Sequence, residues 1–282
     1  MTAVNDMIEV LGFSQIQHGT ENNRIYLMKY DSRDQAQIID LLDDLACKAG
    51  YTKVFAKIPQ AEEGHFRKAG YQTEARIPRF ACGREDYVFM GKYFDDVRSE
   101  SKDLAHITQV LSVAQSKAKS RTGESLDLPE GMHMKILSPI HTTEMAQLYA
   151  LVFETYPFPI HDPAYLLQTM EENIIYFGIF FENRLIALSS SETDIAFLNS
   201  EMTDFAILPA YRGQNLSLIL LHRMEEEMRS KGYKMFYTIA RAMSYGMNAT
   251  FAKADYIFGG TLINNTNISG TIESMNIWYK DA

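Results

Sequence analysis

The chain has little of what marks several protein classes. It has only two cysteines, Cys47 and Cys82, among 282 residues, which cannot form a disulfide framework and show no metal-ligand spacing. No apolar run approaches the roughly 20 residues that a membrane-spanning helix needs. The first ten residues, MTAVNDMIEV, carry acids and lack the apolar stretch of a signal peptide. These absences predict a cytoplasmic protein without a metal site.

Positive charge is also scarce. The sequence has 27 Lys and Arg against 36 Asp and Glu, which gives a formal net charge of −9. A nucleic-acid-binding protein needs a basic face, so we expect neither nucleic acid nor a membrane as a partner, whereas a small cationic substrate is compatible. Hydrophobic residues make up 46% of the chain, which is enough for packed cores and too much for disorder. The length fits two modest domains.

Two α/β patterns follow one another along the chain. Residues 1–100 predict a small unit, with strands at 24–30, 53–58, 71–80 and 87–94 and helices at 33–49 and 59–69. Residues 101–131 predict a helix, at 101–118, and then a polar linker with Gly and Pro. Residues 132–282 predict strands at 132–137, 174–181, 184–191, 200–208, 233–240, 256–263 and 270–280, and helices at 142–153, 163–173, 213–231 and 244–254. This order predicts a mixed α/β sheet covered by helices, preceded by a smaller α/β domain.

The most informative segment is 199–217, NSEMTDFAILPAYRGQNLS. An extended apolar run ends at Leu208-Pro209, turns, passes Arg212-Gly213 and enters an amphipathic helix. The first N–H groups of a helix lack internal partners, and the helix dipole is positive there. A strand that leads through a short turn into a helix therefore forms an anion site, for which a diphosphate-bearing cofactor is the expected ligand. An ordinary connection without a ligand is the alternative.

This strand–turn–helix resembles motif A of the GNAT acetyltransferase superfamily. Arg212 and Gly213 match the start of the motif, whereas Asn215 and Ser217 stand at its later small positions. Asn tolerates left-handed backbone angles and Ser is small, so the loop can still wrap a diphosphate. The element order over 132–282 matches the family as well. The resemblance implies a GNAT fold and acetyl-CoA as the acetyl donor.

The resemblance also implies which residues bind acetyl-CoA. The pantetheine arm would lie along the exposed backbone of the strand, as an added strand would, where the sheet splays. The diphosphate would lie at the turn and the first helical turn. The expected cofactor-binding residues are Phe205, Ala206, Ile207, Leu208, Arg212, Gly213, Gln214, Asn215, Leu216 and Ser217, with Ser244 and Asn248 from the next helix.

The implied reaction is direct attack of an amine on the thioester. An alkyl ammonium, with a pKa of about 10.4, must first lose a proton. Glu201 stands where some relatives carry a glutamate base; a solvated strand-end carboxylate is the alternative. Thr203 shares its face if the strand is regular and Asp204 points away, whereas a β-bulge would exchange these faces. The tyrosine that protonates the thiolate in many relatives is replaced by Phe251, which has no proton to donate.

Two residues could substitute for that missing acid, Tyr245 and Asn248, each with a structural role as the alternative. For the acceptor, the loop at Tyr156 and Phe158 lies where GNAT enzymes often clamp their substrate, although it is equally compatible with a rigid apolar loop. Glu273 stands on an apolar strand face and needs a cationic partner, which is either a substrate or a protein Arg or Lys. Arg241, just past a strand end, is a candidate for a substrate carboxylate.

A short repeat links the two patterns. Residues 66–71 (FRKAGY) match residues 251–256 (FAKADY) at four of six positions. Chance similarity of two helix-to-strand junctions is one interpretation; the other is that the N-terminal unit is a truncated copy of the second half of the C-terminal domain. This copy lacks an equivalent of the turn at 212–217, so we do not expect it to bind the same cofactor.

Five segments carry a closer resemblance: YPFP at 156–159, EMTD at 201–204, ARAMS at 240–244, Asn-Asn-Thr at 264–266 and ESMNIWYK at 273–280. Together they resemble the β-lysine N-acetyltransferases, and the N-terminal unit resembles that family too, so the likeness covers nearly the whole chain. The resemblance implies acetylation of the ε-amine of β-lysine to give Nε-acetyl-β-lysine, a compatible solute. The residues alone indicate only an acyl-CoA-dependent N-acyltransferase for a small amine. Another amino acid, a polyamine or an aminoglycoside stays open as the acceptor. A non-catalytic acyl-CoA-binding module and a homodimer stay open too.

Overall fold

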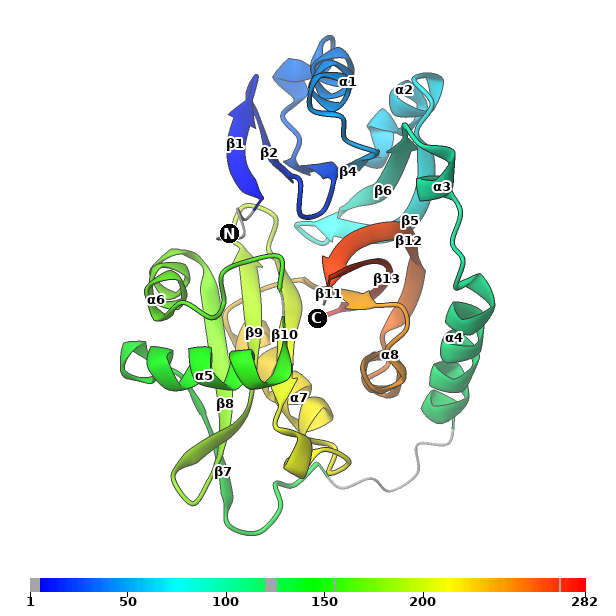
Figure 1. Cartoon of the computed structure of the whole chain (residues 1–282). Helices are drawn as coiled ribbons and strands as arrows, with labels where there is room; N and C mark the ends of the chain where they lie inside the picture. The colour runs from blue at the N-terminus through cyan, green and yellow to red at the C-terminus, as the bar shows by residue number, and fades with distance from the viewer. Residues whose placement is uncertain (1–5, 120–125, 155, 269) are drawn as a thin grey trace.

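The computed structural model describes residues 6–119, 126–154, 156–268 and 270–282. The strands of these residues form one 13-stranded sheet (Figure 1). The strands are β1 (Met7–Leu11), β2 (Ser14–Gly19), β3 (Arg24–Lys29), β4 (Lys53–Pro59), β5 (Gln72–Ala81), β6 (Glu85–Tyr93), β7 (Met132–Ile136), β8 (Ile174–Phe181), β9 (Arg184–Asp194), β10 (Asn199–Ile207), β11 (Met235–Arg241), β12 (Ile257–Ile268) and β13 (Thr271–Asp281). The helices are α1 (Ile38–Ala49), α2 (Glu63–Lys68), α3 (Asp96–Ser99), α4 (Leu104–Lys119), α5 (Thr142–Val152), α6 (Pro163–Glu172), α7 (Leu216–Ser230) and α8 (Tyr245–Lys253). The mixed α/β prediction is confirmed.

The sheet has two related halves, which we call the N-terminal lobe (β1–β6 with α1 and α2) and the C-terminal lobe (β7–β13 with α5–α8). The strand order β2-β3-β4-β6-β5 in the first is repeated as β9-β10-β11-β13-β12 in the second. Both have a parallel pair, β3 with β4 and β10 with β11, followed by an antiparallel pair. The lobes meet edge to edge where Ala75 pairs with Gly260. This shared order favours an internal copy over chance similarity.

The copy is more complete than the sequence predicted. The connection from β3 to α1 is as long as the connection from β10 to α7, so the N-terminal lobe does have an equivalent of the turn. It is acidic, however. The buried carboxylate of Asp34 accepts hydrogen bonds from Phe13 N (2.7 Å) and Ser14 Oγ (2.8 Å). Because an anionic side chain already occupies this turn, it is unsuited to a diphosphate.

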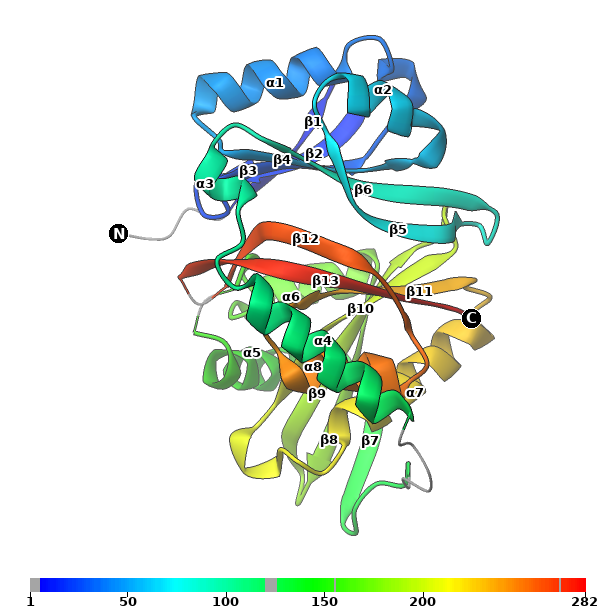
Figure 2. The ribbon, with the colours of Figure 1, turned by 90° about the vertical axis from the view of Figure 1, so that its right-hand side faces the viewer.

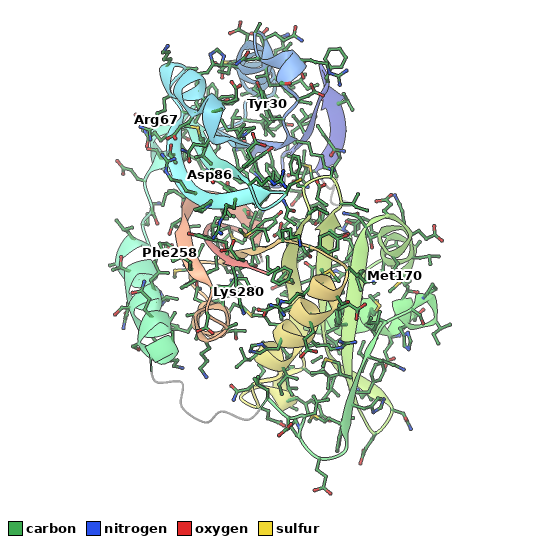
Figure 3. All side chains as sticks on the ribbon, turned by 180° about the vertical axis from the view of Figure 1, so that it is seen from behind. Tyr30, Arg67, Asp86, Met170, Phe258 and Lys280 are labelled. Atoms are coloured by element: carbon green, nitrogen blue, oxygen red, sulfur yellow. The ribbon has the colours of Figure 1, made fainter. Side chains whose placement is uncertain are left out.

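The lobes also pack face to face around a shared apolar core. Phe55, Phe80 and Phe89 of the N-terminal lobe pack with Tyr237 and Ile277 of the C-terminal lobe. Each lobe has a further core of its own. Figure 2 shows the N-terminal strands lying over β12, β13 and β11, and Figure 3 shows side chains filling the space between them. Because the lobes share this buried core, they do not separate into independent units at an obvious boundary. The predicted division into 1–100, 101–131 and 132–282 stays a prediction.

The two faces of the C-terminal half of the sheet carry different elements. Alternation along β11 places Tyr237 toward the N-terminal lobe and Thr238, which pairs with Trp278, toward the opposite face. On that opposite face Trp278 donates to Asn248 of α8, and α4 lies along α8 (Figure 2). The face of Tyr237 also carries α6, whose Thr169 bonds Tyr176 of β8. The N-terminal lobe and α5–α6 therefore cover one face, and α7 and α8 the other.

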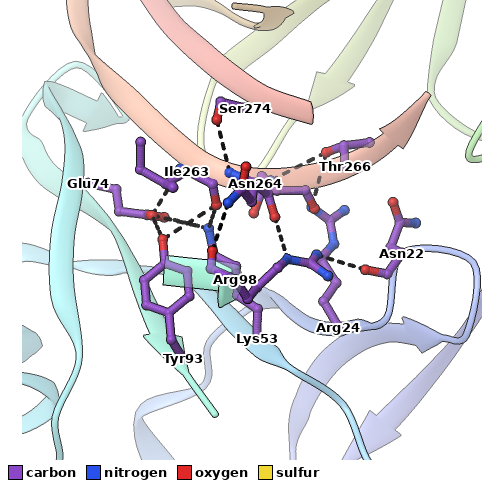
Figure 4. A network of polar contacts seen from close by, with 11 residues as sticks. Asn22, Arg24, Lys53, Glu74, Tyr93, Arg98, Ile263, Asn264, Thr266 and Ser274 are labelled. Atoms are coloured by element: carbon purple, nitrogen blue, oxygen red, sulfur yellow. Dashed lines mark hydrogen bonds and ion pairs between the residues drawn. The ribbon is translucent and has the colours of Figure 1, made fainter. Parts of the chain in front are cut away.

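A buried polar network ties β12 to the N-terminal lobe (Figure 4). The register of β12 against β13 shifts between Leu262 and Thr266, which frees three successive carbonyls from the ladder. Three cations of the N-terminal lobe and its connection donate to them: Lys53 Nζ to Ile263 O (2.7 Å), Arg98 Nε to Asn264 O (2.6 Å) and Arg24 Nη1 to Asn265 O (2.6 Å). Glu74 is the counter-ion, 2.9 Å from Lys53 Nζ. The Asn-Asn-Thr segment therefore joins the lobes.

Candidate active site

A cavity of about 660 Å³ opens between β10, α7 and α8. It exists because the parallel pair β10–β11 is short: its rungs run only from Asn199 with Met235 to Glu201 with Tyr237. Beyond Glu201 the two strands separate, and the β11-facing backbone of β10 is left without a ladder. An extended ligand can add to such an edge by backbone hydrogen bonds.

The mouth of this cavity is the turn that the sequence identified. A short 3-10 turn, Pro209–Tyr211, leads to Gly213 and Asn215, whose φ angles are 81° and 57°. These left-handed residues delay α7, which begins at Leu216 rather than at the predicted Gly213. The side chain of Asn215 makes no capping hydrogen bond, so it leaves the first N–H groups of α7 to an incoming anion.

Most of the predicted cofactor-binding residues meet at this cavity. Phe205, Ile207, Arg212, Gly213, Asn215, Leu216, Ser217 and Ser244 line it. Ala206 and Leu208 lie buried in the core of the C-terminal lobe, and Gln214 is not part of the lining. A ligand can reach Ala206 and Leu208 only through their backbone.

Asn248 has a structural position instead. Its Nδ2 donates to Arg241 O (3.0 Å) and Ser244 O (2.7 Å), and its Oδ1 accepts from Asn276 Nδ2 and Trp278 Nε1. These bonds use the amide, which is fully buried. The geometry does not support the cofactor-binding role predicted for this side chain.

Three carboxylates gather on one face of the sheet, next to the point where β10 and β11 separate. Glu192 of β9 lies directly opposite Glu201. A bulge between Thr203 and Ala206, with a φ of 54° at Asp204, turns Asp204 to the same face, where it accepts from Ser190 Oγ (2.6 Å) and from the hydroxyl of Tyr156. The regular-strand expectation that Asp204 points away is therefore wrong. Thr203 still pairs with Ser190 and keeps the face of Glu201, so the bulge adds Asp204 to this face and does not exchange the two residues.

The electrostatics of this face suit a proton acceptor. Burial, followed by the adjacent Glu192, raises the pKa of Glu201 to about 8, although Lys57 and a hydrogen bond from Tyr237 act in the opposite direction. Burial also raises the pKa of Asp204 and of Glu192. A base whose pKa lies closer to that of an ammonium accepts its proton more readily than an ordinary carboxylate does.

Tyr245 is less suited to its predicted role. It is the first residue of α8, is 38% exposed, and its ring lies 5.5 Å from that of His106. It does not line the cavity, although its neighbours Ser244 and Gly246 do. The hydroxyl of Ser244 accepts from Met247 N (3.3 Å) and so caps the helix. We find no geometric support for Tyr245 as the acid.

The predicted acceptor residues divide into two groups. Tyr156, which binds Asp204, and Thr203 lie at the carboxylates, with Phe158 packed half-buried against the core nearby. Arg241 and Glu273 bind each other, through Nε–Oε2 at 2.9 Å and Nη2–Oε1 at 2.5 Å. The partner of Glu273 is thus a protein arginine, as one of the two alternatives had it. Arg241 also lines the cavity.

Sequence reasoning missed the residues that come from across the lobe boundary. Lys57 of β4 and Tyr26 of β3 interact electrostatically with Glu192 and Glu201. The available signal was Lys57, the second of two lysines in the mostly apolar strand KVFAKIP. Among the described residues, no group of His, Cys, Asp and Glu could hold a metal ion. In that same part of the chain, no helix is both long and apolar enough to cross a membrane.

Comparison with known proteins shows which proteins this chain resembles. The model of the acetyltransferase (GNAT) family matches residues 144–252. The β-lysine N(6)-acetyltransferase of Methanococcus maripaludis is 40% identical over 267 residues, which are 95% of this chain and 96% of that protein. The β-lysine N(6)-acetyltransferase of Methanosarcina mazei is 28% identical and covers 86% of this chain and 96% of that protein. The solved ribosomal-protein-S5-alanine acetyltransferase of Vibrio fischeri aligns with a TM-score of 0.48 at 12% identity, over 55% of this chain and 95% of that one.

Proposed function

The chain belongs to the GNAT family of acetyltransferases, and from this we propose that it transfers the acetyl group of acetyl-CoA to the ε-amine of β-lysine. The observation that carries the proposal is the 40% identity to a β-lysine N(6)-acetyltransferase over 95% of the chain. That likeness includes the N-terminal lobe, which the matched family segment at 144–252 does not.

The cavity fits the donor. The uncapped N-terminus of α7 would hold the diphosphate, with Gly213, Asn215 and Ser217 around it. The unpaired edge of β10 at Phe205 and Ile207 would hold the pantetheine arm. Bound acetyl-CoA supplies an electrophilic carbonyl and a thiolate leaving group.

The residues of the chain prepare the acceptor. Glu201 would take the proton from the incoming ammonium, because its raised pKa is closer to the pKa of the amine than that of an ordinary carboxylate is. Asp204, fixed by Ser190 and Tyr156, would add negative charge beside the amine and hold it near the edge of β10. Backbone N–H groups beyond Glu201 are available to a developing oxyanion.

An acceptor panel tests this proposal. Purified protein is incubated with acetyl-CoA and β-lysine, other diamino acids, polyamines or aminoglycosides, and products are identified by mass spectrometry. We expect acetylated β-lysine modified at the ε-nitrogen, with the largest kcat/KM of the panel. An inert β-lysine beside an active second amine would change the acceptor and keep the chemistry. Binding of acetyl-CoA without turnover on any amine would favour the non-catalytic module.

A further inference from the structure

The acceptor named in the proposed function carries two charges besides its reacting amine, a second ammonium and a carboxylate. On that proposed function we build a more specific one. We propose that the boundary between the lobes is the subsite for these charges: Lys57 of the N-terminal lobe binds the acceptor's carboxylate, and Glu192 of the C-terminal lobe binds its second ammonium. The ligand class is an amino acid with an ammonium and a carboxylate close together at one end and an amine at the other.

The side chain of Lys57 comes to the lobe boundary from β4 of the N-terminal lobe. Its Nζ lies 5.9 Å from the ring centroid of Tyr26, 5.7 Å from that of Phe80 and 5.9 Å from that of Tyr237. Tyr237 pairs with Glu201 at the last rung before β10 and β11 separate. The ammonium of Lys57 therefore lies beside Tyr237 on the N-terminal-lobe side of the sheet, where it interacts electrostatically with Glu192 and Glu201.

The charges around it are unbalanced. Glu192 and Glu201 lie directly opposite on neighbouring antiparallel strands, an arrangement that destabilises a sheet unless a cation is present. Asp204 brings a third carboxylate. The remaining titratable groups that interact with them are six tyrosines, with Lys29 bound to Asp194 (3.4 Å) farther out. The tyrosines are Tyr26, Tyr149, Tyr156, Tyr165, Tyr176 and Tyr237. A ligand with two ammonium groups and one carboxylate complements three carboxylates and one lysine.

The N-terminal wall also holds a buried donor that no residue of the described chain satisfies. Gln17, 2% exposed, lies directly opposite Tyr26 in the β2–β3 pair, so the two side chains share a face. Its Nε2 has no hydrogen-bond partner. Buried amides are rarely left unpaired in this way, and a carboxylate at Lys57 would offer an acceptor on the same wall.

Two truncated acceptors separate the roles of Lys57 and Glu192. The first is the diamine that lacks only the carboxylate of β-lysine; the second is the ω-amino acid that lacks only its β-amine. In Lys57→Met we expect the ratio of kcat/KM for β-lysine to that for the diamine to fall about tenfold or more, because a charged hydrogen bond is lost. In Glu192→Gln we expect a similar fall in the ratio of kcat/KM for β-lysine to that for the ω-amino acid.

Three controls make the result interpretable. Lys57→Arg should retain most of the wild-type ratio, and Lys92→Met, which removes a lysine bound to Asp43 (2.5 Å) on the outer face of the same lobe, should retain all of it. Calorimetric affinity for acetyl-CoA reports whether each variant is folded. If the wild type is active but each variant loses the same factor of kcat/KM on every acceptor, this inference is wrong and the proposed function stands. A wild type that acetylates none of them overturns the proposed function as well.

Discussion

At Glu201 the environment rather than the residue type determines the chemistry. An ordinary glutamate is a weak base toward an ammonium, but burial and the opposing Glu192 raise its pKa to about 8. The resemblance to GNAT enzymes implied Glu201 as the base, because some relatives carry a glutamate at this position. It could not predict Glu192 or Lys57, because cross-strand and cross-lobe neighbours are set by pairing and packing.

Replacing Glu201 by Gln tests the base role. We expect kcat to fall about 10²- to 10⁴-fold, with little change in acetyl-CoA affinity, because the carboxylate lies at the acceptor side of the cleft. In the wild type kcat/KM should rise with pH through a pKa near 8, and this limb should disappear in the variant. Glu226→Gln, at a side chain 66% exposed on α7, is the matched control. An unchanged kcat would remove Glu201 from the mechanism.

The same substitution should change stability in a pH-dependent way. The folded state holds the Glu201 proton more tightly than the unfolded state, since the pKa rises from 4.5 to about 8. This contribution is present below about pH 4.5 and is lost as the pH rises through 8. Glu201→Gln should therefore be more stable than wild type at pH ~9, with the difference shrinking toward pH ~5. Urea unfolding at both pH values measures it; a variant that is less stable at the higher pH contradicts the shifted pKa.

At the scale of elements, the strand–turn–helix from Asn199 to Ser230 was predictable and its details were not. Hydrophobic periodicity gave the strand and the helix. The start of α7 moved to Leu216 because Gly213 and Asn215 take left-handed angles. The bulge at Asp204 could be named only as an alternative. The strands β1 and β2 were missed. The residues of β1, MIEVL, are mostly apolar but do not alternate with polar ones, and β2, SQIQHG, has a single apolar residue.

A charge at the first turn of α7 tests the anion site. Ser217→Asp should raise the Kd of acetyl-CoA about tenfold or more, because the new carboxylate faces the diphosphate. Acetyl-pantetheine, which has no diphosphate, should bind as in wild type. An acid near a helix N-terminus stabilises the helix, so unfolding does not explain a loss. Ser230→Asp, at the other end of α7, is the control. If the affinities for acetyl-CoA and acetyl-pantetheine fall equally, the diphosphate does not bind at this turn.

At the scale of the molecule, two patterns read from the sequence become one sheet with a shared core. Element order and part of the repeat were predictable from composition and periodicity. The packing of Phe80 against Tyr237, with ring centroids 5.0 Å apart, and the three cations on the carbonyls of β12 were not, because both join residues far apart in the sequence. The acceptor side of the site depends on this packing.

The buried network predicts how the lobes unfold. Arg98 joins Asn264 O, Asn22 O (2.8 Å) and Thr52 Oγ1 (3.0 Å). Arg98→Met should cost about 2–4 kcal/mol, because buried carbonyls lose a charged donor. Arg79→Met, which breaks an exposed ion pair with Asp281 across the same lobe boundary, should cost at most about 1 kcal/mol. We expect wild-type denaturation to be a single transition; two separate transitions, with equal effects of both substitutions, would show that the network does not couple the lobes.

The structure of the complex with CoA and acetylated β-lysine is the most direct test of the account. We predict the diphosphate on the amides at the start of α7, the pantetheine arm along residues 205–207 between β10 and β11, and the acetamide of the product beside Glu201. Coenzyme bound outside this cleft, or an acetamide distant from Glu201 with the coenzyme in place, would contradict the account.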